Sequence, residues 1–389
     1  MQYIINAKVV LEHGILWNGV LGIENGRIAL CAPARECTIP ASSQALDAQG
    51  AYVGPGFVDI HVHGRGAYFY EEPEKETAFF LGHGETTILA ALYYNLAKEQ
   101  FLPAIRRVQS FIHSKETCAL AGFYMEGPYM NPAYGACPEQ NQWRGSIQKE
   151  DYIPIIDAAG TDARVWVVAP ERPGIESFVK YAKERNPNAM ISVGHSEATP
   201  EQIRRLKQYG LRMQTHCMNA TGAVSKWLGT KGCGPDEACL LDDDLYAEVI
   251  CDSCGIHVNR ERLQMLLKTK GAERLILITD SFPSTEQGPE ELRYITDLVF
   301  DANGLLNGSR LTMDAACRNM VMHTGCSMTQ AFWMASRNPA RVIGMDHEIG
   351  TIELGKKANL VFVDDAFHVK KVMLEGELQQ VAESREKQC

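Results

Sequence analysis

The chain has 389 residues, of which 45% are hydrophobic, and a formal net charge of −10 at pH 7. This composition predicts a large buried core and excludes a disordered chain, while the acidic balance disfavours a nucleic-acid partner. No apolar run reaches the roughly 20 residues that a bilayer-spanning helix needs, so we expect no membrane partner. The 12 cysteines are expected to be reduced thiols in the cytoplasm, because the N-terminus carries no secretory signal pattern.

Short β-like segments occur near both ends of the chain. They cover residues 3–10, 20–28, 358–363 and 369–374. We expect them to assemble into one small β-sandwich module, made of residues 1–54 and 344–389. The chain between them, residues 55–343, would then form a separate catalytic domain.

Eight short runs rich in Val, Ile, Leu and aromatic residues follow one another through this central region, each followed by a loop and a helical pattern. The runs are 57–61, 86–92, 119–126, 165–169, 189–195, 211–216, 246–251 and 275–280. Amphipathic stretches such as 177–184 and 200–207 are typical of outer helices. Eight such βα units predict an α/β fold, a (β/α)8 TIM-like barrel, whose active site lies at the C-terminal ends of the strands.

Metal-binding side chains stand at the ends of five of these runs. His61 and His63 end the first run, and their spacing places both imidazoles on one face of a strand, where they can chelate one ion. Glu126, His195 and His216 end the third, fifth and sixth runs. Zinc or Fe(II) accepts such imidazole and carboxylate ligands and needs one open position for water. A single histidine would be interpreted as a buried, hydrogen-bonded imidazole, but five strand ends together favour a metal centre.

Asp280 ends the eighth run, where a carboxylate beside metal-bound water can act as a general base and later as a general acid. The alternative is a turn or helix N-cap aspartate before Ser281. The motif Cys251-Asp252-Ser253-Cys254 could indicate structural zinc, but two further ligands at suitable spacing are lacking, which favours reduced core thiols. His323 and His347 are interpreted as structural.

The chain resembles the amidohydrolase superfamily and, within it, the N-acetylglucosamine-6-phosphate deacetylases. The motifs that carry this resemblance are Pro-Gly-Phe-Val-Asp-Ile-His-Val-His-Gly at 55–64, Glu-Gly-Pro at 126–128, Ala-Pro-Glu at 169–171, Gly-His-Ser at 194–196, the segments 215–220 and 255–258, Thr-Asp at 279–280, and the segments 308–313, 335–340 and 350–356. The resemblance implies hydrolysis of the N-acetyl group of an N-acetylhexosamine 6-phosphate, with N-acetylglucosamine 6-phosphate as the first expectation. It also implies one or two divalent ions, with zinc ahead of iron, manganese or cobalt, and a homodimer.

The resemblance also implies roles for individual residues. Glu126, His195 and His216 would hold the principal metal, with Glu126 able to bridge to a second ion at His61 and His63. His257 would polarise the amide carbonyl of the substrate. Other residues would grip the amino sugar, namely Ala136, Cys137, Asn219, Ala220, Lys226, Leu306, Asn307 and Gly308.

Three departures from the family pattern bear on the substrate. Cys137 stands where the deacetylases tend to have a substrate-contacting histidine, and Ser225-Lys226-Trp227, with Lys231 nearby, replaces a phosphate-binding arginine. Lysine binds phosphate as a point charge rather than as a bidentate fork. The segment 281–284 departs from the small residues usual after the aspartate. These changes leave open an amidohydrolase acting on a different amide or on a non-phosphorylated N-acetyl sugar. A non-catalytic metal-binding barrel is the third possibility and comes last, because Asp280 and all the core metal ligands are present.

Overall fold

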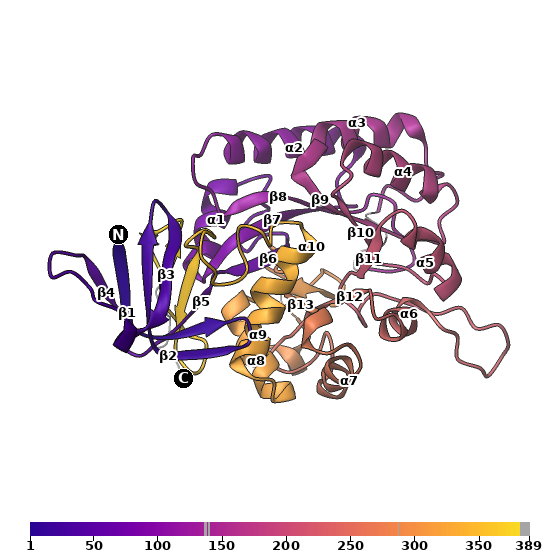
Figure 1. The fold of residues 1–389 in the computed structure, drawn as a ribbon. Coiled ribbons are helices and arrows are strands. Elements are labelled where there is room, and N and C mark those ends of the chain that lie inside the picture. Colours follow the sequence, from indigo (N-terminus) through magenta and orange to yellow (C-terminus); the bar gives the residue numbers. More distant parts are fainter. Residues whose placement is uncertain (136–137, 139–140, 287, 382–389) are drawn as a thin grey trace.

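The computed structural model describes residues 1–135, 138, 141–286 and 288–381. Its centre is a sheet of eight parallel strands in sequential order, which forms the predicted barrel (Figure 1). The strands are β6 (Phe57–Val62), β7 (Glu85–Tyr93), β8 (Leu120–Glu126), β9 (Ala163–Val168), β10 (Met190–Val193), β11 (Leu211–Gln214), β12 (Tyr246–Ile250) and β13 (Leu275–Ile278). All eight predicted runs therefore contain strands, and β10, β11 and β13 end two residues before the predicted ends.

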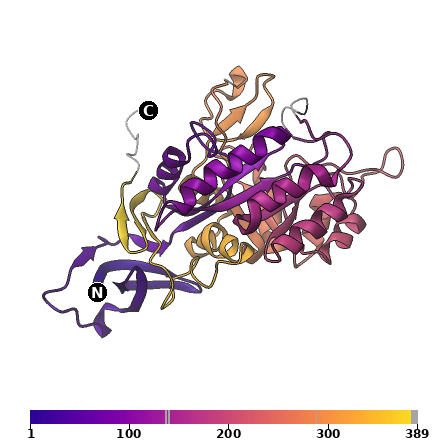
Figure 2. The same cartoon turned by 90° about the horizontal axis from the view of Figure 1, so that it is seen from above.

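One helix follows each barrel strand, and these helices cover the outside of the sheet (Figures 1 and 2). They are α1 (Pro73–Gly82), α2 (Lys98–His113), α3 (Lys149–Ala159), α4 (Ile175–Arg185), α5 (Pro200–Lys207), α6 (Pro235–Leu241), α7 (Arg260–Lys270) and α8 (Met313–Thr324). Helix α5 shows why the sequence starts a helix here: Thr199 and Gln202 form a reciprocal capping box, and Pro200 occupies the first helical position. The helices expected at 177–184 and 200–207 are confirmed.

The barrel closes between its first and last strands by contacts just beyond the end of β13. The Asp280 N–H donates to the His61 carbonyl at 2.9 Å, and the His63 N–H donates to the Ser281 carbonyl at 2.9 Å. Below them, the buried Asp59 carboxylate accepts a hydrogen bond from the Thr279 hydroxyl at 2.5 Å. This seam brings Asp280 against the pair His61 and His63, although more than 200 residues separate them.

The two chain ends form a second, mixed sheet, as predicted. Its strands are β1 (Gln2–Leu11), β2 (Gly14–Glu24), β3 (Arg27–Pro33), β4 (Ala45–Asp47), β5 (Tyr52–Pro55), β16 (Leu360–Val363), β17 (Val369–Leu374) and β18 (Glu377–Gln379). Antiparallel pairing of β5 with β16 joins the two ends. All eight strands belong to one hydrogen-bonded network, in which β4 pairs with residues 3–5 of β1 and β5 pairs with residues 8–9 of the same strand.

The C-terminal helical segment connects this sheet to the barrel. It consists of α9 (Met328–Phe332), a π-helical turn (Trp333–Arg337) and α10 (Asn338–Val342). The buried Phe332 ring stacks on Phe57 of β6 with centroids 5.6 Å apart, and it also contacts Phe367. A side chain at Gly54 would lie 2.3 Å from Phe332, so glycine is needed for this close approach. The boundaries at 54/55 and 343/344 between the β module and the catalytic domain remain a prediction.

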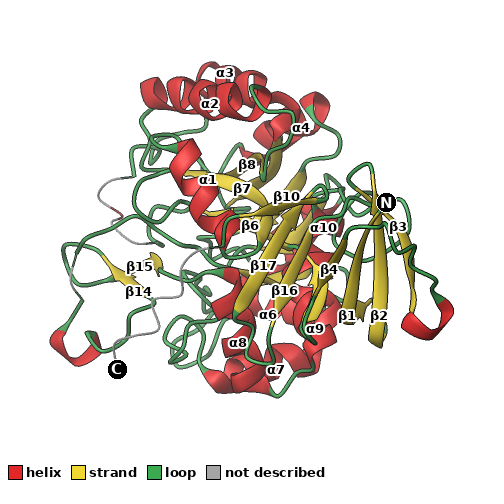
Figure 3. Ribbon diagram, turned by 90° about the vertical axis from the view of Figure 1, so that its left-hand side faces the viewer, coloured by secondary structure: helices red, strands yellow, loops and turns green. Residues whose placement is uncertain are grey.

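A hairpin interrupts the βα pattern between β13 and α8. Its strands β14 (Leu298–Phe300) and β15 (Leu306–Ser309) pair antiparallel and stand apart from the barrel strands (Figure 3). Ile295, Leu298 and Phe300 give it a small core of its own. Within the described ranges, every helix is too short or too polar to cross a membrane.

Candidate metal centre and active site

Three of the predicted site residues follow strand ends in an unusual backbone conformation. His195, His216 and Asp280 have φ values of 43°, 28° and 47°, directly after or close to the ends of β10, β11 and β13. A non-glycine residue with positive φ is uncommon and costs free energy, and such residues cluster at functional sites. This local turn ends each strand and places the side chain at the barrel mouth.

Glu126, His195 and His216 form the first group of potential metal ligands. The Glu126 Oε1 lies 2.8 Å from the His195 Nε2 and 3.3 Å from the His216 Nε2. The two Nε2 atoms are 3.0 Å apart, so the three ligand atoms converge on one point. All three residues are buried, which supplies the water-poor surroundings typical of a metal centre.

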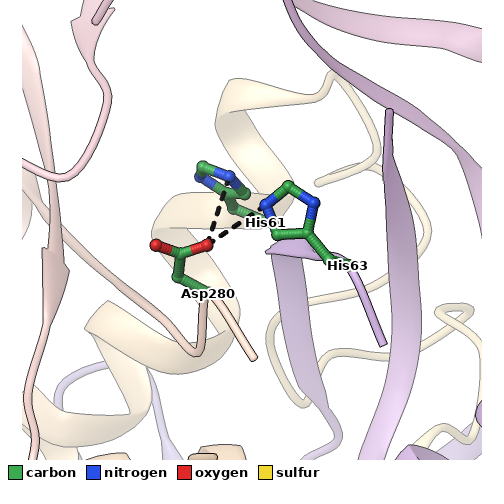
Figure 4. Close-up of side chains that lie close together, drawn as sticks. All are labelled: His61, His63 and Asp280. Carbon is green, nitrogen blue, oxygen red and sulfur yellow. Dashed lines mark ion pairs between the residues drawn. The ribbon is translucent and has the colours of Figure 1, made fainter. Parts of the chain in front are cut away.

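His61, His63 and Asp280 form a second group beside the first (Figure 4). The Asp280 Oδ1 lies 3.2 Å from the His63 Nε2 and 3.7 Å from the His61 Nε2. The other oxygen of Glu126, Oε2, lies 3.2 Å from the His63 Nε2. Glu126 therefore faces one group with each of its oxygens, which is the geometry that a bridging carboxylate requires.

The donor atoms of both groups fit a divalent cation. Imidazole nitrogens and carboxylate oxygens are the ligands that zinc and similar metals accept. The His61 Nε2 is buried and has no hydrogen-bond partner, although it points toward Glu126 and Asp280. An unpartnered buried nitrogen is costly, and binding a cation would remove that cost.

Electrostatics keep the carboxylates of the site ionised. Burial opposes ionisation of Glu126, but the charge of His61 and hydrogen bonds from His195 and His216 hold the pKa of this carboxyl well below its usual value. The pKa of Asp280 is also lowered, because the interactions with His61 and His63 outweigh its burial. Ionised carboxylates are what metal binding and proton acceptance both require.

A cavity of about 300 Å³ opens over these two groups. Its lining residues are His63, Tyr93, Tyr94, Glu126, Gly135, His195, His216, Asn219, Ala220, His257, Asp280, Phe282, Leu305, Leu306, Asn307 and Gly308. A cavity of this size suits a small ligand. The structure thus brings the predicted residues at or beyond the ends of β6, β8, β10, β11, β12 and β13 together with the β14–β15 hairpin around one cavity.

His257 is held at the edge of this cavity by a buried carboxylate that the sequence analysis did not single out. The Asp252 Oδ2 lies 3.0 Å from the His257 Nδ1 and also accepts the His257 backbone N–H. Although burial opposes it, the hydrogen bond from His257 lowers the pKa of Asp252 to about 2. The Nε2 of His257 lies 3.0 Å from the Gly308 carbonyl, where the hairpin meets the barrel.

The predicted sugar-binding residues separate into three sets. Asn219, Ala220 and the segment 306–308 line the cavity. Lys226 and Lys231 lie instead on an exposed loop, and Lys226 borders a separate surface hollow formed by residues 225–230. The predicted contacts of Ala136 and Cys137 lie outside the described residues.

The structure bears on the alternatives for Asp280, for the cysteine motif at 251–254 and for His323. No described residue from 281 to 286 is helical, so Asp280 does not cap a helix. Cys251 is buried, Cys254 is exposed, and neither belongs to a ligand group among the described residues. The Nε2 of His323 lies 3.0 Å from the Asp252 carbonyl, which agrees with the structural interpretation.

Sequence reasoning missed the aromatic side of the cavity. Tyr93, Tyr94 and Phe282 line it, and the His63 ring contacts Tyr93 and Phe282 with centroids 4.9 and 5.1 Å away. Tyr93 and Tyr94 directly follow the second predicted run, so the barrel rule could have placed them at the mouth. Phe282 was noticed only as a departure from the family pattern.

The chain is similar to known proteins over nearly its whole length. The sequence model of the Amidohydrolase family matches residues 52–378. An N-acetylgalactosamine-6-phosphate deacetylase from Escherichia coli is 31% identical over 398 residues, covering 97% of this chain and 99% of the relative. An N-acetylglucosamine-6-phosphate deacetylase from Haemophilus influenzae is 26% identical, with coverage of 97% and 99%.

Solved structures agree with this relationship. The N-acetylglucosamine-6-phosphate deacetylase of Pasteurella multocida superposes with a TM-score of 0.85 at 25% identity, covering 97% of this chain and 99% of the other. A mutant of the Mycobacterium smegmatis enzyme, in complex with N-acetyl-D-glucosamine 6-phosphate, gives a TM-score of 0.81 at 27% identity, with coverage of 98% and 99%. The chain therefore belongs to the amidohydrolase family and, within it, to the family of the N-acetylglucosamine-6-phosphate and N-acetylgalactosamine-6-phosphate deacetylases.

Proposed function

We propose that this protein hydrolyses the N-acetyl group of an N-acetylhexosamine 6-phosphate, releasing acetate and the amino sugar phosphate. The observation that carries the proposal is the pair of buried ligand groups that share Glu126 and adjoin Asp280 at the floor of one cavity. Relatives that act on the glucosamine and on the galactosamine compound both align with nearly the whole chain. The amide, the sugar ring and the phosphate are thus the expected parts of the substrate, with N-acetylglucosamine 6-phosphate as the first candidate.

Glu126, His195 and His216 would hold the principal divalent ion, and His61, His63 and Asp280 a second one. Zinc is the first candidate because of the mixed nitrogen and oxygen ligands, with iron, manganese and cobalt as alternatives. A bound divalent ion lowers the pKa of water and polarises a carbonyl oxygen.

Asp280 would act as the general base and acid. Its carboxylate is ionised and lies at the cavity floor, so it can take a proton from the attacking water. The same group can then deliver that proton to the departing nitrogen of the amino sugar. His257, oriented through its Nδ1 by Asp252, would donate from its Nε2 to the carbonyl oxygen of the acetyl group in place of the Gly308 carbonyl.

The sugar would be gripped by Asn219, Ala220 and the hairpin segment 306–308, which supply polar and backbone groups to the cavity. Lys226 or Lys231 would pair with the phosphate, and Cys137 would adjoin the sugar. Because both lysines lie on an exposed loop, phosphate binding at this position needs the substrate to extend from the cavity toward that loop. The position of these lysines outside the cavity lining also supports a second candidate, an amidohydrolase of a non-phosphorylated N-acetyl sugar or of another amide.

The deciding experiment measures acetate release by metal-loaded protein from four substrates. These are N-acetylglucosamine and N-acetylgalactosamine, each with and without the 6-phosphate. We expect a higher kcat/KM for at least one phosphorylated sugar than for its free form. Hydrolysis of none of the four by protein with full metal content would reject the proposal, and preference for a free sugar would favour the second candidate.

Two further features complete the proposal. We expect the protein to work in the cytoplasm, where its cysteines, free in all described positions, would stay reduced. We also expect a homodimer in solution, by resemblance to the deacetylases. Light scattering coupled to size-exclusion chromatography tests the second expectation, and a monomer mass would contradict it.

A further inference from the structure

A third buried carboxylate lies directly behind the two ligand groups. Glu248 on β12 has no solvent exposure, and the proposed mechanism does not use it. Its Oε2 lies 3.4 Å from the His61 Nδ1 and 2.9 Å from the Tyr124 hydroxyl, which donates to it. The backbone N–H of His216 donates to the same oxygen at 3.3 Å. One oxygen of Glu248 therefore contacts a member of each ligand group.

The charge of Glu248 is not neutralised by lysine or arginine. Among the described residues, its one ion-pair partner is His61, and its Oε1 is buried without a hydrogen-bond partner. Burying a carboxylate is expensive unless a positive charge offsets it. Positive charge near His61 would offset the charge of Glu248. A cation bound at the His61 Nε2, the ring nitrogen opposite the one that faces Glu248, would supply it.

The contacts of His61 determine which ring nitrogen faces the other metal ligands and which faces Glu248. The Nδ1 faces Glu248, an acceptor, so it is the nitrogen that bears hydrogen. The Nε2 points toward Asp280 (Figure 4) and toward Glu126, at 3.7 and 3.6 Å from their oxygens, and it would be free of hydrogen when a cation binds there. The Tyr124 ring stacks on the His61 ring with centroids 4.0 Å apart and an interplanar angle of 21°, which restricts rotation of the imidazole.

The supporting contacts continue through the barrel interior. The Tyr124 hydroxyl lies 2.8 Å from the Thr215 Oγ1, which in turn lies 2.7 Å from the Ser192 Oγ. These side chains come from β8, β10 and the end of β11, and they hold the Tyr124 hydroxyl beside Glu248. Rigid support of this kind preserves ligand geometry at metal centres.

We propose that Glu248 is a positioning residue that sets the tautomer and ring orientation of His61, so that the group His61, His63 and Asp280 can bind a divalent cation. This inference rests on the metal-binding part of the proposed function and not on the identity of the substrate. Loss of such a supporting carboxylate typically weakens metal binding by about 10- to 100-fold. The effect should fall on this group and spare the ion held by Glu126, His195 and His216, because Glu248 contacts the ring of His61 but only the backbone N–H of His216.

The test titrates metal-free protein with zinc by calorimetry and counts bound zinc by elemental analysis. We expect two ions in the wild type. Glu248→Ala should bind the second ion about 10- to 100-fold more weakly and the first with unchanged affinity. Glu248→Gln keeps an acceptor for the His61 Nδ1–H but removes the charge, so its affinity for the second ion should lie between those of Glu248→Ala and the wild type.

Glu85→Gln is the matched control, because Glu85 is a fully buried barrel carboxylate that accepts the Met313 N–H and belongs to neither ligand group. It should bind both ions as the wild type does. If Glu248→Ala does not fold, Tyr124→Phe serves instead: it keeps the ring on His61, removes the hydroxyl at Glu248, and should weaken the second ion by a few-fold.

Three results would overturn the inference. They are a single ion in the wild type, unchanged affinity for both ions in Glu248→Ala, and equal weakening of both ions in that variant, which would indicate general structural damage. No arm of this experiment measures catalysis. A protein that binds zinc as expected but releases no acetate from any of the four sugars would therefore refute the proposed activity and leave the role of Glu248 supported.

Discussion

Replacing Glu126 with glutamine tests whether one side chain serves both ligand groups. The Oε1 of Glu126 lies 2.8 Å from the His195 Nε2, and the Oε2 lies 3.2 Å from the His63 Nε2. Glutamine keeps one oxygen and places an NH2 group, which cannot be a ligand, at the other. Whichever way the amide turns, one ligand group loses its oxygen ligand from residue 126, and both groups lose the negative charge of the carboxylate.

The magnitude follows from Coulomb's law. Two opposite unit charges about 4 Å apart attract by about 4 kcal/mol at an effective dielectric constant of about 20, and a divalent ion gains more. Since each 1.4 kcal/mol is about tenfold in affinity, Glu126→Gln should weaken metal binding by at least about a thousandfold. Elemental analysis after dialysis should find the principal site empty, while Glu85→Gln keeps its metal. Full metal retention in Glu126→Gln would refute the assignment.

Three other changes probe catalysis, the phosphate and the fold. Asp280→Asn should reduce turnover by about two to four orders of magnitude while the ion at Glu126 stays bound, and an unchanged rate of acetate release would rule out a general base role. Exchanging Lys226 and Lys231 for alanine should raise KM for the phosphorylated sugar more than it lowers kcat, because a phosphate contact is present in both the ground state and the transition state. Equal kcat/KM values in the variant and the wild type would show that these lysines do not bind phosphate. Phe332→Ala should lower the free energy of unfolding by about 3 to 5 kcal/mol, since it opens a cavity against Phe57, and denaturant titration would reveal a smaller loss if the packing relaxes.

Much of the architecture could be predicted from the sequence because its signals are local. Buried parallel strands need continuous apolar runs, and eight such runs with helical patterns between them leave few alternatives to a barrel. The rule that barrel enzymes place their chemistry at the C-terminal strand ends then selected His61, His63, Glu126, His195 and Asp280 without any structure. Each lies where that rule expects it, at or just beyond its strand.

Other features depend on contacts between distant segments and could not be predicted locally. Glu248 occupies the middle of an apolar run, and only the closed barrel shows that its carboxylate meets His61 across the interior. Lys226 lies ten residues after His216 in sequence, yet the loop carries it out of the cavity to an exposed position. Hydrophobic periodicity reports which face of a segment is buried, but it contains no information about which other segment that face meets.

The same limit applies to the division of labour at the metal centre. The sequence by itself determined that histidines and carboxylates would gather at one end of a barrel, because strand direction and alternation are properties of single segments. Only the tertiary structure decided that Glu126 faces both groups and that Asp280 lies against His63 rather than capping a helix. The position of Asp280 against His63 depends on the seam between β6 and β13, which closes through backbone hydrogen bonds between the first and last strands of the barrel.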